Sequence, residues 1–338
     1  MSANVLSCAS GVGVLNCDLL FSGLSRLPVE GEEIYAKGFD MQLGGGLPAT
    51  LIHLARLGVP VDFSTFLGEG RISRFIRELL DQSGAKYRNL YQGTGEPVTV
   101  TSVLILPTDR TFVSRCEDIV YTDEMKQTLL EQFRGASVVR MGLELLDVYQ
   151  QLKKERPDVQ LVLDESWRED LSLSRYADYL HIADYYTPNQ QEAAKITGKE
   201  KPEDALDALQ PYFAHPIVKL GGDGCLVDTD AGVVRVPTMK LDGPAVDATG
   251  AGDAFIAGLM YGLYHHRPLV ECVALGNVMG GAIFTLADFA LAVSCNIGEE
   301  PTVSVDSNIS FLRATQGTRL TATSVCDKPG RHLGFYTV

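Results

Sequence analysis

The stretch DATGAGDAFIAGLMYGL, residues 247–263, decides the fold. It runs from a glycine-rich turn into a helix that is apolar on every side. Gly250 and Gly252 carry no Cβ, so the backbone can approach a ligand closely, and the first amides of a helix lack partners and carry partial positive charge. Such a turn suits an anion whose charge grows during a reaction. The carboxylate of Asp253 could then take a proton from an attacking hydroxyl. An ordinary glycine-rich strand-to-helix loop is the structural alternative.

The bulk composition bounds the class of protein. The chain has 338 residues, 45% of them hydrophobic, which allows one large domain or two modest ones. A formal net charge of −14 argues against binding to nucleic acid or to an anionic membrane. Seven cysteines without a C-x-x-C pair indicate free thiols in a reducing cytoplasm, and no signal peptide is recognisable. The apolar run 269–293 contains Glu271 and Asp288, so buried helices fit it better than a membrane span.

Strands and helices alternate through the middle of the chain, which predicts an α/β fold with a mainly parallel sheet and helices on both faces. The earlier strands break that rhythm, and we expect them to form a small separate sheet over the strand ends. The first apolar run is expected to end in a polar turn at Asn16 to Asp18. The main-sheet strands are expected at 137–141, 159–163, 179–182 and 215–220, and the lid strands at about 12–23, 33–43 and 97–116.

The segment TPNQQEA, residues 187–193, places Asn189 at a helix start with Glu192 three residues later. This is the spacing of a capping box, and a plain capping box is one interpretation. The other is that both residues support hydrated Mg²⁺ and phosphate, because Mg²⁺ keeps several waters and uses few protein carboxylates.

Two weaker signals complete the pattern. The turn in VKLGGDGC, 218–225, could lie against a planar base or a phosphate, although a β-hairpin would use the same residues. Asp18 in NCD, 16–18, facing the glycines of LGGG, 43–46, could bind sugar hydroxyls, or it could be a solvated turn residue.

In order and spacing, these segments resemble the PfkB/ribokinase family of carbohydrate kinases over residues 1 to about 280. The resemblance rests on the glycine pair before a helix that ends in LARLG, on N-x-x-E at 189–192, on KLGGDG, and on D-x-T-G-A-G-D at 247–253. It implies a ribokinase-like domain over 1–279 with a small β lid. It also implies transfer of a phosphoryl group from ATP, with Mg²⁺, to a hydroxyl of a small sugar-like alcohol. Part of the motif matches the loop that holds K⁺ in the potassium-activated members, and whether this chain depends on K⁺ stays open.

The resemblance also implies residue roles. Asp253 would be the base, and the amides of Gly250, Ala251 and Gly252 would form the anion hole. The sugar contacts would come from Asp18, Gly44, Gly45, Glu144 and Arg168. The nucleotide and its phosphates would lie against Asn189, Lys219, Gly221, Gly224 and Asn277. The metal positions would be Glu192 for Mg²⁺, with Asp247 and Thr249 for a monovalent cation.

The chain departs from the family in its acceptor segments. The Asn that follows the glycine pair in the family is replaced by Ala49, and Ser166 replaces the Asn of a D-x-N-x-R pattern. Hydroxyl recognition is then left to Asp18 and backbone groups, which argues against ribose. Ribose, fructose, ketodeoxygluconate and a nucleoside all stay open. Lid strands in this family often pair between subunits, which favours a homodimer.

The end of the chain, 280–338, resembles part of a hotdog-fold acyl-CoA thioesterase of the phenylacetate-pathway type. In that family the residue matching Asp288 serves the hydrolytic water. Several elements of a hotdog domain lack a match, so we interpret this α+β segment as a truncated fragment. Two alternatives to an active kinase stay open: a sugar- or nucleotide-binding protein without turnover, and a bifunctional kinase with a thioesterase-like tail.

Overall fold

A computed structural model describes residues 7–83, 85–106, 110–165, 169–229, 231–238, 250–282, 325–328 and 335–337. Its centre is a nine-stranded sheet with the strand order β13-β12-β11-β10-β9-β8-β1-β4-β5. All neighbours pair in parallel except β11 with β12 and β12 with β13. The strands are β1 (Cys8–Val12), β4 (Val61–Thr65), β5 (Tyr87–Asn89), β8 (Ala136–Met141), β9 (Gln160–Leu163), β10 (Tyr185–Tyr186), β11 (His215–Lys219), β12 (Cys225–Thr229) and β13 (Gly232–Val236).

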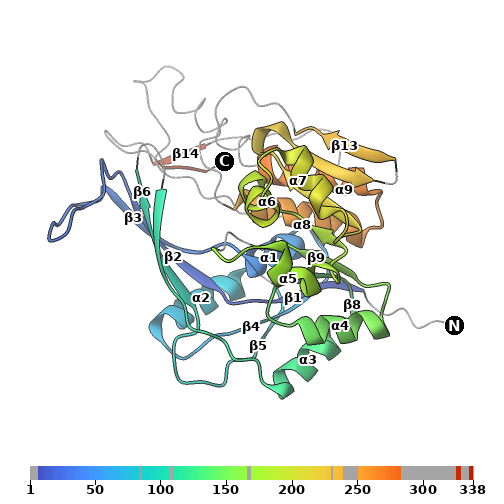
Figure 1. Cartoon of the computed structure of the whole chain (residues 1–338). Coiled ribbons are helices and arrows are strands. Elements are labelled where there is room, and N and C mark those ends of the chain that lie inside the picture. The colour runs from blue at the N-terminus through green and yellow to red at the C-terminus, as the bar shows by residue number, and fades with distance from the viewer. Residues whose placement is uncertain are drawn as a thin grey trace.

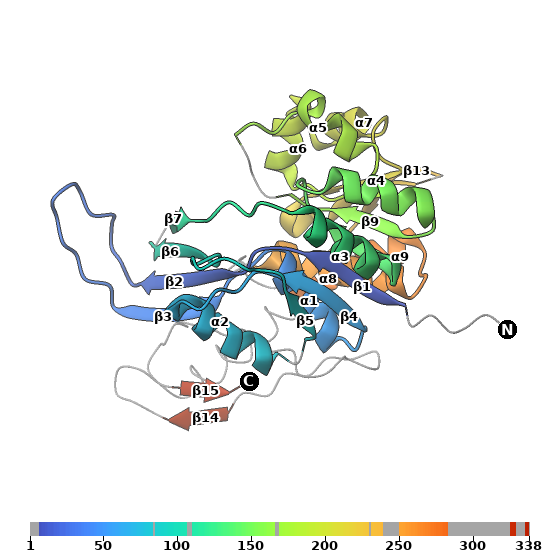
Figure 2. The ribbon, with the colours of Figure 1, turned by 90° about the horizontal axis from the view of Figure 1, so that it is seen from below.

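Helices cover both faces of this sheet (Figures 1 and 2), as expected for parallel strands joined by crossover helices. Two buried clusters of apolar side chains result, one on each face. One face carries α3 (Asp123–Arg134), α4 (Leu146–Glu155), α5 (Leu173–Leu180), α6 (Gln190–Thr197) and α7 (Pro202–Leu209). The other carries α1 (Leu47–Arg56), α2 (Arg71–Gln82), α8 (Ala251–Tyr264) and α9 (Leu269–Asn277).

Helix α8 is buried along almost its whole length. Its residues from Ala254 to Met260 are all buried, since it packs between α1, α9 and the sheet. A Cβ at Gly258 would come within 2.5 Å of the carbonyl oxygen of Leu275, so this glycine permits the close packing of α8 on α9. The helix that begins in the motif 247–253 is therefore fixed rigidly to the core.

A second sheet of four strands projects from the main body (Figure 2), in the order β3-β2-β6-β7. Its strands are β2 (Asn16–Ser22), β3 (Gly38–Leu43), β6 (Thr99–Ile105) and β7 (Arg110–Arg115). The separate small sheet expected from the sequence is thus present. Its strands are shorter than the expected ranges, because part of each range is connecting loop.

Two local predictions are wrong. Asn16 to Asp18 form no turn: they begin β2 and pair with β3 and β6. The expected strand 179–182 is occupied by the end of α5 and a turn, because Tyr176 and Leu180 lie one helical turn apart and are both buried. The strand of that region, β10, comes later and has only two residues.

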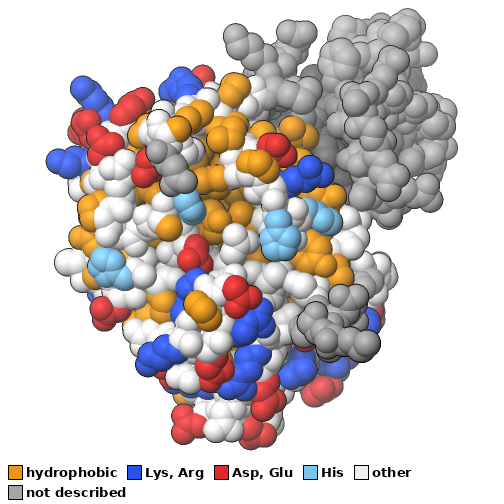
Figure 3. All heavy atoms as spheres, turned by 90° about the vertical axis from the view of Figure 1, so that its right-hand side faces the viewer, with side chains coloured by type: hydrophobic (Ala, Val, Ile, Leu, Met, Phe, Trp, Pro, Cys, Tyr) orange, Lys and Arg blue, Asp and Glu red, His pale blue; other side chains and the backbone are white. Residues whose placement is uncertain are grey.

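The tail contributes two short strands to the described structure. β14 (Val325–Lys328) pairs antiparallel with β15 (Phe335–Thr337). Asp288 and the rest of the expected central helix beyond Ala282 lie outside the described residues. Within the described ranges, no helix has the length and apolarity that would be needed to cross a bilayer. On the face seen in Figure 3, Lys and Arg side chains are intermixed with Asp and Glu instead of forming a basic field.

Candidate active site

Asp253 lies in the first turn of α8, three residues after Gly250. Gly250 precedes the helix and adopts a left-handed conformation at φ 73°. The Asp253 side chain is 14% exposed. One carboxylate oxygen, Oδ2, accepts a hydrogen bond from the amide of Gly46 at 2.8 Å. The other, Oδ1, faces Arg140 Nη1 at 3.1 Å and Thr50 Oγ1 at 3.5 Å. The carboxylate is therefore held by groups from α1, its preceding loop and β8, not by its own helix.

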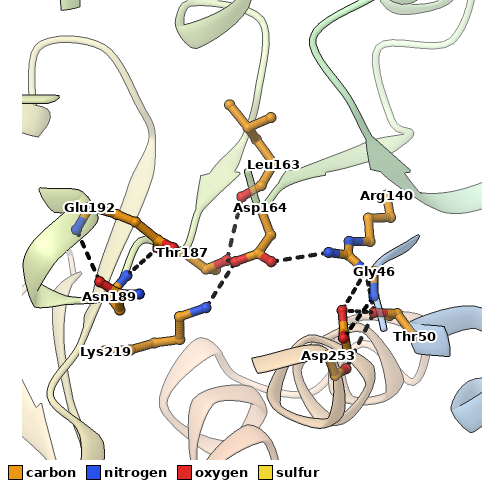
Figure 4. Close-up of polar contacts among 10 residues, drawn as sticks. All are labelled: Gly46, Thr50, Arg140, Leu163, Asp164, Thr187, Asn189, Glu192, Lys219 and Asp253. Carbon is orange, nitrogen blue, oxygen red and sulfur yellow. Dashed lines mark hydrogen bonds and ion pairs between the residues drawn. The ribbon is translucent and has the colours of Figure 1, made fainter. Parts of the chain in front are cut away.

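Arg140 continues a row of charges across the carboxyl ends of the strands (Figure 4). Its Nη2 lies 3.0 Å from Oδ2 of Asp164, which follows β9. Oδ1 of Asp164 in turn lies 2.9 Å from Nζ of Lys219, the last residue of β11, and accepts a hydrogen bond from Thr187 at 2.8 Å. Asp253, Arg140, Asp164 and Lys219 thus alternate in charge and sum to zero.

Lys219 brings this row to the start of α8. A Cβ at Gly252 would lie 3.8 Å from Lys219 Nζ, which also lies 5.8 Å from the centre of the Phe255 ring. An ammonium group therefore faces the helix amides that the sequence assigns to an anion. The contact of Lys219 with a nucleotide stays a prediction, and its position near Gly252 is compatible with a nucleotide phosphate.

Asp164 is buried at the centre of the row. Burial alone would raise its pKa, but the charges of Lys219 and Arg140 and the hydrogen bonds from Lys219 and Thr187 outweigh it, so the pKa lies below its usual value. Asp164 is therefore a carboxylate at neutral pH and keeps both cations in place.

The lid supplies a second carboxylate. Asp18 accepts a hydrogen bond from Asn16 Nδ2 at 2.7 Å, and burial raises its pKa. A Cβ at Gly44 would lie 2.7 Å from Oδ2 of Asp18, and a Cβ at Gly45 would lie 2.6 Å from Oδ2 of Asp253. Two consecutive glycines thus run between a lid carboxylate and the α8 carboxylate. Neither position leaves room for a side chain, which is a physical reason for both glycines.

Asn189 and Glu192 form the capping box that their spacing predicts. Asn189 Oδ1 accepts from the amide of Glu192 at 2.9 Å, and Glu192 Oε2 accepts from the amide of Asn189 at 2.8 Å. Burial raises the pKa of Glu192, opposed by that hydrogen bond and by Lys219. Asn189 also lies beside Lys219 in a parallel bridge, so the start of α6 faces the same edge of the sheet.

The glycine turn 221–224 connects β11 and β12 as a hairpin with a short 3-10 turn (η1, Gly221–Asp223). Gly221 and Gly224 both have positive φ, and a Cβ at Gly224 would come within 2.1 Å of the carbonyl oxygen of Val236. Asn277 is buried and donates to the same carbonyl at 3.1 Å. Gly221 and Gly224 thus belong to the hairpin that follows Lys219, and Asn277 connects this part of the sheet to α9.

The remaining predicted residues are not joined to these groups by any described contact. Glu144 is exposed, and its charge adds to the effect of burial in raising the pKa of the Tyr121 and Tyr149 hydroxyls. Arg168, Asp247 and Thr249 lie outside the described residues. Across the described ranges, no group of three His, Cys, Asp or Glu side chains could hold a metal ion by itself.

Sequence reasoning missed Arg140, Asp164, Thr50 and Thr187. Arg140 lies near the end of the strand ASVVRM, and Asp164 directly follows the strand QLVL. Each is thus a charged residue at the end of an otherwise mostly buried strand. Carboxyl ends of parallel strands are where ligands bind in open α/β sheets, and that signal was present in the sequence. By contrast, a hollow of about 600 Å³ lined by Asp62, Lys86, Arg88 and Gln132 opens at the opposite strand ends, away from the motifs.

The profile of the pfkB family carbohydrate kinases matches residues 13–287. The chain belongs to this family. The thioesterase superfamily profile matches residues 275–338, which agrees with the resemblance of the tail to a hotdog-fold thioesterase.

Three similar proteins show how far the resemblance extends along the chain. A cytidine kinase from Thermococcus kodakarensis is 38% identical over 90 residues, which span 26% of this chain and only 32% of that protein. A ribokinase from Arabidopsis thaliana is 25% identical over 278 residues, 78% of this chain and 72% of that protein. The solved structure of Arabidopsis thaliana ribokinase with ribose and ATP superposes with a TM-score of 0.68 at 22% identity, covering 81% of this chain and 91% of that one. The ribokinase-like fold is thereby confirmed, and the family to which the chain belongs is one of carbohydrate kinases.

Proposed function

We propose that this PfkB-family chain transfers the γ-phosphoryl group of ATP to a hydroxyl of a small sugar or sugar-like alcohol. One observation carries the proposal: the glycines 44 and 45 run between the carboxylates of Asp18 and Asp253, and Asp253 lies in the first turn of α8, where Gly252 is close to the ammonium of Lys219. A polyhydroxyl acceptor and a phosphate would thus meet at one point.

In this reaction Asp253 would take the proton of the acceptor hydroxyl. The hydroxyl oxygen forms a bond to the γ-phosphorus, the bond from that phosphorus to the bridging oxygen breaks, and ADP leaves with its electron pair. The amides of Gly250, Ala251 and Gly252 would bind the charged oxygens of the moving phosphoryl group, because fixed dipoles in a water-poor site stabilise developing charge. Lys219, near Gly252, would bind a phosphate oxygen.

The acceptor would lie against one face of the lid. Gln42, Asp18 and Thr101 stand opposite one another on β3, β2 and β6, and Thr101 contacts Ser114 of β7 at 2.9 Å. This row of polar side chains is suited to several hydroxyl groups. Lid closure over it would exclude water and so limit hydrolysis of ATP.

Glu192 is the protein carboxylate that would face hydrated Mg²⁺. One of its oxygens is engaged in the capping box, and the other is not used by that box. Bound Mg²⁺ would neutralise phosphate charge, with ATP and water supplying most of its ligands, since Mg²⁺ is commonly held by one or two carboxylates plus substrate phosphates. Asp247 and Thr249 stay predictions for a K⁺ site.

The proposal is tested by measuring ADP release on a panel that includes ribose, fructose, ketodeoxygluconate and nucleosides, with and without K⁺. Turnover with at least one acceptor supports the kinase. Calorimetric binding of sugar and ATP with no ADP formed on any acceptor would instead favour a binding protein without turnover.

A homodimer through the lid is a further part of the proposal. Phe39 on β3 and Val113 on β7 belong to one face of the lid sheet and are 59% and 66% exposed. Apolar side chains this exposed are typical of interfaces. Light scattering should give twice the chain mass, and Phe39→Asp should restore the monomer; a monomeric parent protein would refute this point.

The match of residues 275–338 to the thioesterase superfamily favours a second activity as an alternative. An aryl-CoA thioester would be hydrolysed by water activated at Asp288. Hydrolysis that survives Asp253→Asn but not Asp288→Ala would support the alternative, and absence of hydrolysis in the parent protein would eliminate it.

A further inference from the structure

Arg140 has an unusual position for an arginine. Its side chain is 5% exposed, on a strand at the centre of the sheet. Nη1 faces Asp253 and Nη2 faces Asp164, at 3.1 and 3.0 Å, and Nη1 also donates to Thr50. Taking a guanidinium out of water is unfavourable unless charges compensate it. Two carboxylates from different elements do so here.

We propose that Arg140 is a positioning residue for the phosphoryl transfer. It fixes the Asp253 carboxylate in the orientation that accepts the acceptor proton, and through Asp164 it connects this base to Lys219 on the phosphate side. The expected effect of Arg140 on the rate rests on the proposed function. Its contact with Asp253 can be tested without measuring turnover.

The geometry explains why an arginine is needed. Its planar fork presents two donors at a fixed separation and can bind two carboxylates at once, whereas the ammonium of lysine is a compact point charge. With Oδ1 on Arg140 and Oδ2 on the Gly46 amide, the carboxylate of Asp253 cannot rotate freely. Orientation of a reacting group is among the largest contributions to catalysis.

Among the described residues, Arg140 is the cation in contact with Asp253. The imidazole of His53 on α1 feels the charge of Asp253, but burial and Arg56 lower its pKa despite that effect, so it is neutral near pH 7. Lys219 is paired with Asp164. Asp18 lies beside Gly44 and is a carboxyl group, not a cation. Loss of the guanidinium would thus leave Asp253 without a cation in contact among the described residues.

The kinetic test compares the kcat and KM of Arg140→Gln and Arg140→Lys with those of the parent protein. For Arg140→Gln we expect kcat to fall about 10- to 100-fold with little change in KM, because orientation is lost and not ground-state binding. Arg140→Lys keeps a positive charge beside Asp253 but not the planar fork, so it should recover only part of the lost kcat.

Lys153→Met is the matched control. It removes another partly buried ion pair, with Asp184 at 2.9 Å, which lies at the opposite strand ends from Asp253. It should lower stability without a comparable loss in kcat. A kcat that falls no further in Arg140→Gln than in Lys153→Met would overturn the inference.

A double-mutant cycle in thermal unfolding tests the contact without turnover. Arg140→Gln and Asp253→Asn are measured singly and together, and the cycle is repeated with Arg140→Lys in case the first variant does not fold. We expect the combined loss in Tm to be clearly smaller than the sum, because each change breaks the same contact. Additive losses would refute the role of Arg140. Coupling in a protein that phosphorylates no acceptor would refute the proposed function and leave the contact established.

Discussion

The starts of α8 and α6 differ in how they use an acidic residue in the first turn. Glu192 completes the capping box of its own helix, with a partner three residues away. Asp253 makes no such cap and is held by Gly46 and Arg140, which are 207 and 113 residues away. The capping contact of Glu192 connects residues of its own helix start. The contacts of Asp253 instead connect the start of α8 to α1 and β8.

Asp253→Asn tests the difference between the two helix starts most directly and should have the largest effect on kcat. The amide keeps the shape of the side chain but cannot accept the hydroxyl proton. We expect kcat to fall ~10²- to 10⁴-fold, while calorimetry still detects ATP binding. An unchanged kcat would remove Asp253 from the mechanism and with it the distinction between the two helix starts.

Gly45→Ala should affect the rate next most strongly. Its new Cβ would lie 2.6 Å from Oδ2 of Asp253, so the carboxylate or the loop must move. A displacement on the order of 1 Å can lower the rate about 100-fold, and we expect a loss in kcat of up to that size. Gly135→Ala is the control, because its Cβ would lie at an ordinary 3.5 Å from the Gln132 carbonyl. Equal rates in both variants would contradict the site geometry.

Changes at Glu192 should separate its local role from its proposed metal role. Glutamine still completes a capping box, so Glu192→Gln should keep Tm near that of the parent protein while raising the Mg²⁺ concentration for half-maximal rate about 10-fold. Glu192→Ala should also lose the cap, at about 1 kcal/mol of unfolding free energy. An unchanged Mg²⁺ requirement in Glu192→Gln would restrict this residue to capping.

The smallest expected effect concerns pH and has opposite signs at two carboxylates. The lowered pKa of Asp164 means that its contribution to stability is present above its unfolded pKa and is lost as pH falls through the folded value, below about 4. The raised pKa of Glu192 means that its contribution is lost as pH rises above about 4.5. Chemical unfolding between pH 3 and pH 7 measures how the free energy of unfolding depends on pH. Asp164→Asn should reduce the rise of this free energy with pH, and Glu192→Gln should reduce its fall with pH. Changes of the same sign in the two variants would contradict the assigned environments.

Much of the fold could be predicted from local signals. The expected strands 137–141, 159–163 and 215–220 correspond to β8, β9 and β11, and the early strands were assigned to a separate sheet. The errors have local causes. Asn16 to Asp18 have turn-like composition, yet β2 continues through them because β3 and β6 pair with it on both sides. Residues 179–182 fit the pattern of a helix as well as that of a strand. Only the packing of α5 on the sheet decides between the two.

The sequence by itself determined the helix start at Gly250, the position of Asp253 in the first turn of α8, and the capping box of α6. Each depends on interactions within a few residues, which the order of side chains specifies directly. Only the tertiary structure decided that Arg140 and Asp164 connect Asp253 to Lys219. Those contacts span 113, 24 and 55 residues. They exist because the strand order places the carboxyl ends of β8, β9 and β11 along one edge, opposite the start of α8.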